Sequence, residues 1–160
     1  MPLHLEIVTP ERRAFEGDVD EVVVPGSEGA LGILPHHAPL VSLLGAGVLR
    51  LKCNGEEQEF AIFGGFLQVR PDRVVVLAET ADMASDIDVA RAERARREAE
   101  KVIEDPTLEP ADLMSARGAL ERALIRLKVA ERGARTAPRR EHEGARRRPP
   151  TDGSQQPPGE

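Results

Sequence analysis

Two pairs of charged residues near the middle of the chain have the spacing expected of a ligand-binding site. Asp88 and Arg91 stand three residues apart, and Arg122 and Arg126 stand four apart. Each pair therefore shares one face of a helix, and antiparallel helices joined near Thr107 would bring the pairs to about the same level. A carboxylate can accept hydrogen bonds from an adenine amine or a ribose hydroxyl, and guanidinium groups can hold phosphate oxygens. This pattern predicts a nucleotide site; the alternative is solvated charges or interhelical salt bridges worth little each.

Other patterns give weaker signals of ligand or metal binding. The stretch Gly26–Gly32 is rich in glycine and follows an apolar run, as phosphate-binding loops do. It lacks the Lys-Ser or Lys-Thr ending of such loops, and Glu28 repels anions, so we expect a tight surface loop. His36 and His37 are adjacent, and neighbouring side chains on an extended segment point in opposite directions. We expect a surface turn there rather than a metal site.

The sequence offers no candidate for nucleophilic catalysis. No serine stands in a nucleophile-elbow context, and the lone cysteine, Cys53, lies within an alternating, strand-like segment. The acidic residues are spread over expected helix faces and turns, where solvation accounts for them. We therefore expect a non-catalytic protein that requires no cofactor and holds no metal.

Two helices are expected to carry the charged pairs. Ser85–Asp88 resembles a capping box and predicts a helix start, and Asp105–Pro106 predicts the end of that helix at Glu104. Pro110 suits the first turn of a second helix, which is expected to stop at Gly133. Apolar residues recur at helical spacings on both segments, which predicts an antiparallel pair with a narrow contact. These residues are Ile87, Ala92, Ala95, Ala99 and Val102 in the first helix and Leu113, Ala116, Leu120, Ala123, Leu127 and Ala130 in the second.

The first half of the chain has the pattern of an antiparallel β domain. From Leu3 to about Ala78 apolar residues tend to alternate, and Gly, Pro, Asn and Asp interrupt them at short intervals. Leu3, Leu5 and Ile7 place one face of the first strand inward. Asn54–Gly55 suits the positive φ angles of a tight hairpin between two alternating runs. The expected product is a β-sandwich or a flattened barrel.

Length and composition narrow the class of protein. A chain of 160 residues allows one full domain plus a small appendage. We expect an α+β fold with a β-sandwich over residues 1–83, a helical hairpin over 84–133 and a disordered Arg- and Pro-rich tail over 134–160. The net charge of −6 disfavours nucleic acid as a partner. No segment has the roughly 20 apolar residues that span a bilayer, so any membrane role is expected to be peripheral.

Several segments resemble, in the expected order, those of the ATP synthase epsilon family. The longest is Val22–Leu40, and Gly64–Val69, Val75–Ala81 and Ile87–Ala92 follow it. The likeness runs from about Leu3 to Arg132. It implies a bacterial epsilon subunit of the F-type, proton-translocating ATP synthase, with an N-terminal β-sandwich and a C-terminal helical hairpin. Periodicity predicts the same architecture independently.

The resemblance implies a rotor subunit in the central stalk of that enzyme. The sandwich would join the gamma subunit to the c-ring and help couple proton translocation to ATP synthesis, peripheral to the cytoplasmic face of a bacterial plasma membrane. His37 and the surrounding Glu28–Leu40 match the family segment that approaches the c-ring, but Ala30 replaces an acidic residue found in many relatives. The hairpin would inhibit ATP hydrolysis by extending toward the catalytic alpha and beta subunits.

In several bacterial relatives the hairpin also binds ATP. ATP bound to the folded hairpin is expected to stabilise it by mass action, so that inhibition appears when ATP falls. One arginine of the family motif is matched less cleanly, because Glu98 stands at the aligned place and Arg97 stands beside it. The resemblance assigns ATP binding to Ile87, Asp88, Arg91, Ala92, Arg122 and Arg126.

Two other functions remain open. The chain could be a free-standing nucleotide or small-anion sensor, with the hairpin as receptor and the sandwich as scaffold. Such a sensor would purify alone, whereas a rotor subunit would co-isolate with gamma and catalytic subunits. The arginine-rich runs beyond Gly133 could instead tether the chain to nucleic acid or a membrane, and their deletion would then abolish a salt-sensitive association.

Overall fold

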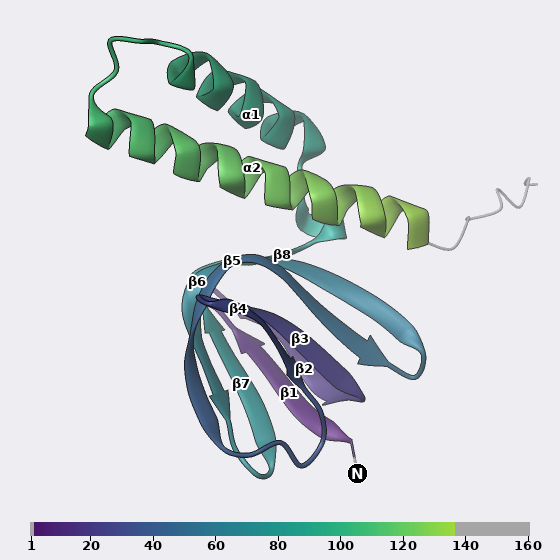
Figure 1. Ribbon diagram of the computed structural model, residues 1–160. Coiled ribbons are helices and arrows are strands. Elements are labelled where there is room, and N and C mark those ends of the chain that lie inside the picture. The colour runs from purple at the N-terminus through teal and green to yellow at the C-terminus, as the bar shows by residue number, and fades with distance from the viewer. Residues whose placement is uncertain (1, 137–160) are drawn as a thin grey trace, which may run out of the picture.

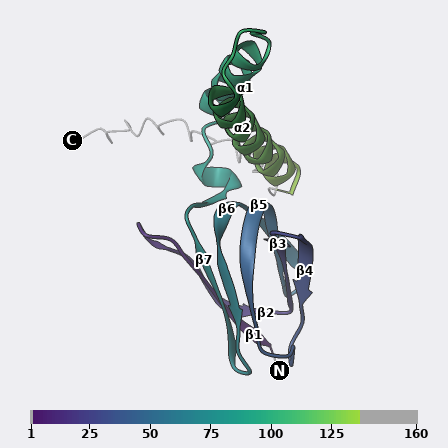
Figure 2. The same cartoon turned by 60° about the vertical axis from the view of Figure 1, so that its left-hand side comes forward.

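A computed structural model describes residues 2–136 and divides them between a β-sheet body and a helical hairpin (Figure 1). The strands come first along the chain and the helices last, so the predicted sandwich followed by a hairpin is confirmed. The hairpin lies across one end of the body, beyond β5 and β6 (Figure 2). The elements are β1 (Leu3–Val8), β2 (Arg13–Val19), β3 (Glu21–Gly26), β4 (Gly29–Ile33), β5 (Leu40–Cys53), β6 (Glu56–Val69), β7 (Arg73–Ala78), β8 (Ala81–Met83), the 3-10 turn η1 (Ala84–Asp86), α1 (Val89–Ile103) and α2 (Pro110–Thr136).

The strands of the body are hydrogen-bonded in the order β2-β1-β7-β6-β5-β3-β4, and β8 pairs with β6 beside this path. β1 and β7 run parallel, and the other neighbouring strands run antiparallel. Figure 2 shows the sheet curling so that its parts face each other. Leu3, Leu5 and Ile7 of β1 are buried in the core that this curling encloses, as their alternation predicts.

β5 and β6 form the long hairpin that the sequence predicts. Leu49 lies opposite Phe60, and Cys53 lies opposite Glu56 at the closed end. Asn54 has a φ of 52° and Gly55 a φ of 81°, which are the positive angles that a two-residue hairpin turn requires. The predicted tight turn is confirmed.

The glycine-rich stretch Gly26–Gly32 is more than the surface loop that its sequence predicts. The chain turns after Gly26 and returns as β4, which places Gly26 opposite Gly29 and Val22 opposite Ile33. The Gly and Ala residues of β4 give no apolar alternation, and Ile33 is its buried residue. Backbone pairing with β3 therefore forms this strand, and such pairing leaves little trace in the side-chain pattern.

Gly65 marks a close approach of β6 to β7. Its φ is 122°, and a Cβ on it would lie 1.9 Å from the carbonyl oxygen of Leu77. We expect Gly65→Ala to lower the free energy of unfolding by about 3 kcal/mol or more, because backbone strain and steric overlap both oppose the new methyl group. Gly17→Ala is the matched control, since a Cβ there would lie 3.5 Å from the ring of Phe15. Equal free energies of unfolding in urea for the two variants would contradict this expectation.

The first helix begins later than the Ser85–Asp88 pattern predicts. The chain first forms η1, whose N-cap makes no side-chain hydrogen bond, and α1 starts at Val89. The N-cap of α1 is Asp88, which accepts a hydrogen bond from the backbone N of Arg91 at 3.1 Å. The predicted capping box is therefore wrong, because its acidic member is itself the cap.

The second helix begins at Pro110, as predicted, but it does not stop at Gly133. α2 continues to Thr136, and the Cα of Gly133 packs so closely on η1 that a Cβ would lie 2.2 Å from the Cβ of Ala84. Gly133 thus satisfies a packing requirement instead of ending the helix. Residues 134–136 of the predicted disordered tail are helical, and residues 137–160 lie outside the described part of the chain.

Small residues lie at the contact between α1 and α2, as predicted. Val102, near the connecting loop, is 41% exposed because α2 is only beginning beside it. Ile87 precedes α1 and packs into the apolar cluster where α2 meets the sandwich. Neither helix in residues 2–136 combines the length and apolar character needed to cross a bilayer. The buried residues of the contact are Ala92, Ala99, Ala116 and Ala123.

Candidate functional site

The two helices and the segment from β8 to the start of α1 line a pocket of about 450 Å³, which we call the hairpin pocket. Alanines of both helices contribute to its walls, and their short side chains leave room between charged groups. The antiparallel arrangement therefore brings together the residues that the sequence places in two distant pairs. All six predicted site residues line the pocket: Ile87, Asp88, Arg91, Ala92, Arg122 and Arg126.

Arg91 and Arg122 are the uncompensated cations of the hairpin pocket. Arg91 belongs to α1 and Arg122 to α2, so they reach the pocket from different helices. Both residues are exposed, and within residues 2–136 neither guanidinium takes part in an ion pair or a hydrogen bond. Two such groups can bind one phosphate or carboxylate without first giving up an internal partner.

Arg126 differs from these two because its guanidinium is already engaged. Its Nε donates a hydrogen bond to Oδ2 of Asp82 on β8 at 3.1 Å. Its central carbon lies 4.8 Å from the centroid of the Phe63 ring, a cation–π distance. Arg126 therefore links α2 to the sandwich. An anion that binds its guanidinium must compete with Asp82 for the hydrogen bonds of that group.

Asp88 serves both the helix and the pocket. Its Oδ1 accepts the capping hydrogen bond from the backbone of Arg91, and this bond fixes the carboxylate at the pocket wall. Within residues 2–136 no hydrogen bond to Oδ2 is formed, so this oxygen can accept from a ligand amine or hydroxyl. Arg97 and Glu98, where the family motif is matched less cleanly, do not line the pocket.

Two acidic residues of the pocket, Asp82 and Asp86, are not among the site residues predicted from the sequence. Asp82 pairs with Arg126, and Asp86 accepts a hydrogen bond from Arg12 at 2.8 Å. The hydrogen bond and the charge of Asp86 raise the pKa of Arg12. With these two carboxylates paired, the two cations Arg91 and Arg122 outnumber the one remaining carboxylate of the pocket, Asp88, so the pocket favours an anion. The partners are 44 and 74 residues apart in sequence, so no local signal reveals them.

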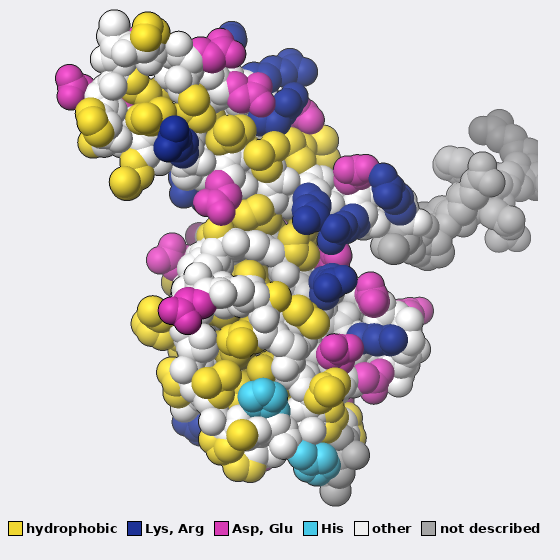
Figure 3. Space-filling view, in the orientation of Figure 1, with side chains coloured by type: hydrophobic (Ala, Val, Ile, Leu, Met, Phe, Trp, Pro, Cys, Tyr) yellow, Lys and Arg dark blue, Asp and Glu magenta, His cyan; other side chains and the backbone are white. Residues whose placement is uncertain are grey.

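The segment that the resemblance relates to the c-ring spans both ends of β4. Ala30 lines a groove beside α2, together with Arg117 and Lys128. Beyond the other end of β4, His36 and His37 form a surface turn, as predicted, with a φ of 64° at His36. Figure 3 shows histidine side chains on the part of the sandwich away from the hairpin.

One group of potential metal ligands lies elsewhere in the described residues. His4, Glu6 and Glu16, on β1 and β2, hold their ligand atoms within 4.8 Å of one another. Arg73 pairs with Glu6, and Arg13 pairs with Glu16. Both carboxylates are thus engaged by arginine, and the group is explained as a surface charge network.

Comparison with known proteins assigns the sandwich and the hairpin to two domains of the same protein family. The ATP synthase delta/epsilon chain beta-sandwich domain matches residues 2–84, and the long alpha-helix domain of the same chain matches residues 85–131. The ATP synthase epsilon chain of Dehalococcoides mccartyi is 50% identical over 130 residues, covering 81% of this chain and 93% of the relative. That of Halalkalibacterium halodurans is 48% identical, covering 81% of this chain and 98% of the relative.

Solved structures with a similar fold come from mitochondrial ATP synthases. A chain of the Euglena gracilis OSCP/F1/c-ring assembly superposes with a TM-score of 0.70 at 23% identity, and 81% of each chain is covered. A chain of the Tetrahymena thermophila central stalk/c-ring gives a TM-score of 0.53 at 14% identity, covering 81% of this chain and 97% of the other. At these identities the likeness concerns the fold.

Proposed function

Because this chain belongs to the family of bacterial F-type ATP synthase epsilon chains, we propose that it is a non-catalytic subunit of the central stalk. In this role its sandwich joins the gamma subunit to the c-ring and turns with them, so that proton translocation is coupled to ATP synthesis. The chain then lies at the cytoplasmic face of the plasma membrane without entering it.

The observation that carries this proposal is a row of exposed apolar side chains across the sheet. Leu43, Phe66 and Leu77 lie directly opposite one another on β5, β6 and β7, and they are 54%, 55% and 49% exposed. Val41, two residues before Leu43 on the same strand, is 68% exposed. Apolar side chains gather over this part of the sandwich in Figure 3. A contiguous exposed apolar surface of this kind is typical of a protein–protein interface.

The apolar row suits the gamma subunit, and the turn beyond β4 suits the c-ring. The docked hairpin covers Phe63 but leaves Phe66, further along β6, exposed. A partner can therefore bind the row while the hairpin is folded. Leu34 and His36, at the turn after β4, are also exposed and remain accessible to a second partner.

The hairpin supplies regulation in this proposal. A nucleotide in the hairpin pocket, with its phosphates at Arg91 and Arg122 and its base or ribose near Asp88, stabilises the folded hairpin. When nucleotide is absent, a larger fraction of hairpins extends toward the alpha and beta subunits, and this extended fraction inhibits ATP hydrolysis. The two uncompensated guanidinium groups support this assignment, because they can engage phosphate without losing an internal partner.

A double substitution tests the rotor role. Leu43→Asp with Phe66→Asp should reduce co-purification of gamma at least about tenfold, because each aspartate places a charge where about 1.5–3 kcal/mol of apolar burial is expected. Met114→Asp is the control, since Met114 is 77% exposed on the hairpin and lies outside the row. Thermal unfolding should first show that both variants remain folded. Undiminished gamma binding by the folded double variant would refute the proposed interface.

A further inference from the structure

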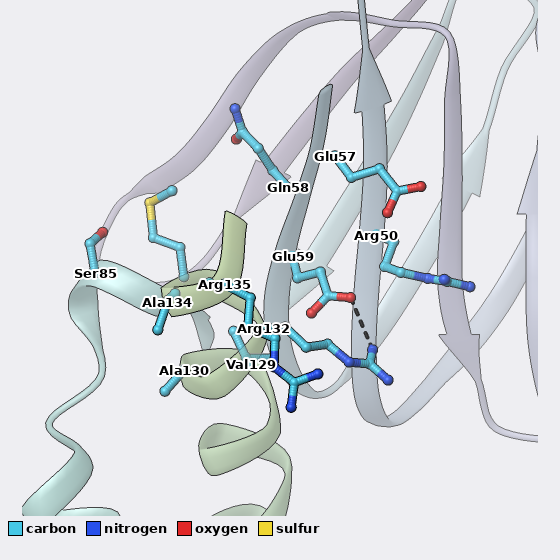
Figure 4. Close-up of a pocket in the computed structure, with 13 residues that line it drawn as sticks. Arg50, Glu57, Gln58, Glu59, Ser85, Val129, Ala130, Arg132, Ala134 and Arg135 are labelled. Carbon is cyan, nitrogen blue, oxygen red and sulfur yellow. Dashed lines mark hydrogen bonds and ion pairs between the residues drawn. The ribbon is translucent and has the colours of Figure 1, made fainter. Parts of the chain in front are cut away.

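The last turns of α2 contact the sandwich through three residues, Val129, Arg132 and Gly133, which we call the foot of α2. None of the three lines the hairpin pocket. They lie instead beside a second pocket, of about 680 Å³, at the end of the helix (Figure 4). The hairpin is therefore attached to the sandwich both beside the hairpin pocket, through Arg126, and at the foot, and Phe63 takes part in both attachments.

Val129 provides the apolar part of the foot. It is completely buried and packs with Ala61 and Phe63, which face out of the sandwich from β6. Ile125, one turn earlier on α2, packs against the same cluster. If the hairpin moved away, all of this apolar surface would be exposed to water, which opposes release.

Arg132 provides the charged part of the foot. Its Nη1 donates a hydrogen bond to Oε1 of Glu59 on β6 at 3.0 Å, as the dashed line in Figure 4 shows. The side chain of Glu59 is only 14% exposed, and within residues 2–136 its enclosed Oε2 has no hydrogen-bond partner. While the hairpin is docked, this enclosed carboxylate therefore depends on a cation that α2 supplies.

Gly133 decides how closely the foot can approach. A Cβ on this residue would lie 2.2 Å from the Cβ of Ala84, far inside van der Waals contact. Ala84 belongs to η1, which directly follows β8, and β8 is hydrogen-bonded to β6. Asp86, at the end of η1, is further held by Arg12. Since η1 is anchored on both sides, Ala84 cannot easily retreat from a larger residue.

We propose that the foot of α2 is a nucleotide-independent lock that holds the hairpin on the sandwich, and that Gly133 is the residue that allows it to close. The resting position of the hairpin is then set by two contacts, the hairpin pocket and the foot, which adjoin at Phe63. Ligand binding adjusts the hairpin pocket, whereas steric fit and ion pairing at the foot fix the population that is docked before any ligand binds.

The test is a nuclear magnetic resonance measurement on the full chain without nucleotide. Contacts between the methyl groups of Val129 and the ring of Phe63 should be present in the natural chain and about tenfold weaker in Gly133→Ala. Gly118→Ala is the matched control: both changes raise the helix propensity of α2, but a Cβ at residue 118 would meet only Nη1 of Arg122, at 3.5 Å. This control should keep the contacts.

A compensating change makes the test specific for the lock. Ala84→Gly removes the atom that a Cβ at residue 133 would strike, so the double variant Gly133→Ala/Ala84→Gly should regain the contacts. Persistence of the contacts in Gly133→Ala alone, or failure of the double variant to restore them, would overturn the lock. Contacts between Phe15 and Phe60, whose rings lie 6.3 Å apart, report whether the sandwich is intact.

A second variant guards against misfolding of the helix. Glu59→Lys leaves α2 unchanged but places a cation opposite Arg132, so it should also weaken the contacts between Val129 and Phe63. Unchanged contacts in this variant would contradict the charged part of the lock. The sample contains neither nucleotide nor partner subunits. The outcome therefore does not depend on whether the proposed ATP binding and rotor role are correct.

Discussion

ATP should raise the melting temperature of the isolated chain, and Arg122→Ala should abolish most of that rise. Arg122 lines the hairpin pocket and gives up no internal partner when it binds an anion. Its loss should cost about 1.5–3 kcal/mol of binding free energy, which is about ten- to hundredfold in affinity. At ATP concentrations near 100 times the dissociation constant, the natural chain should gain about 2.7 kcal/mol, a shift of several degrees.

The control for this experiment is Arg117→Ala on the same helix. Arg117 is exposed and borders the groove beside Ala30, not the hairpin pocket. Without ATP both variants should melt within about 0.5 kcal/mol of the natural chain, as exposed substitutions usually do. Arg126→Ala would be a poorer test, because it also breaks the pair with Asp82 and the contact with Phe63. If ATP stabilised Arg122→Ala as much as the natural chain, ATP binding in the hairpin pocket would be refuted.

Ending the chain after Asp86 should increase ATP hydrolysis by the assembled enzyme. This truncation removes α1 and α2, and with them the proposed inhibitory segment. If the hairpin inhibits for half of the time, hydrolysis should rise about twofold, and the rise should be larger at low ATP concentration. The measurement is the rate of ATP hydrolysis at several ATP concentrations. An unchanged rate would refute regulation by the hairpin but would leave the rotor role intact.

The truncated chain should still fold and bind gamma. The main core draws its buried side chains from residues 3–81, and no helix residue belongs to it. Removal of the hairpin does uncover Ala61 and Phe63, so a lower melting temperature is expected. A chain ending after Thr136 is the matched control, because it keeps both helices and lacks only residues 137–160. A salt-sensitive association lost in this control would instead support the tether alternative.

The structure agrees with the predictions where a local sequence pattern determines the conformation. Leu3, Leu5 and Ile7 alternate because successive strand residues face opposite sides, and burial of one side follows directly. Asn54–Gly55 allows the positive φ angles of a tight turn, and Pro110 suits a first helical turn. Helical spacing likewise predicted that residues as distant as Asp88 and Arg122 would line one pocket. That they bind a nucleotide remains a prediction.

Other features depend on atoms that meet only after the chain has folded. Gly133 resembles a helix stop, yet the methyl group of Ala84, far away in sequence, is the reason that glycine is needed there. The pairing of Arg126 with Asp82 likewise cannot be read from spacing. The sequence alone therefore determined the elements and the order of the fold, because periodicity and turn chemistry act over a few residues. Only the tertiary structure decided which arginines already have an acidic partner and where α2 packs against the sandwich, because ion pairing and steric contact depend on distance in space.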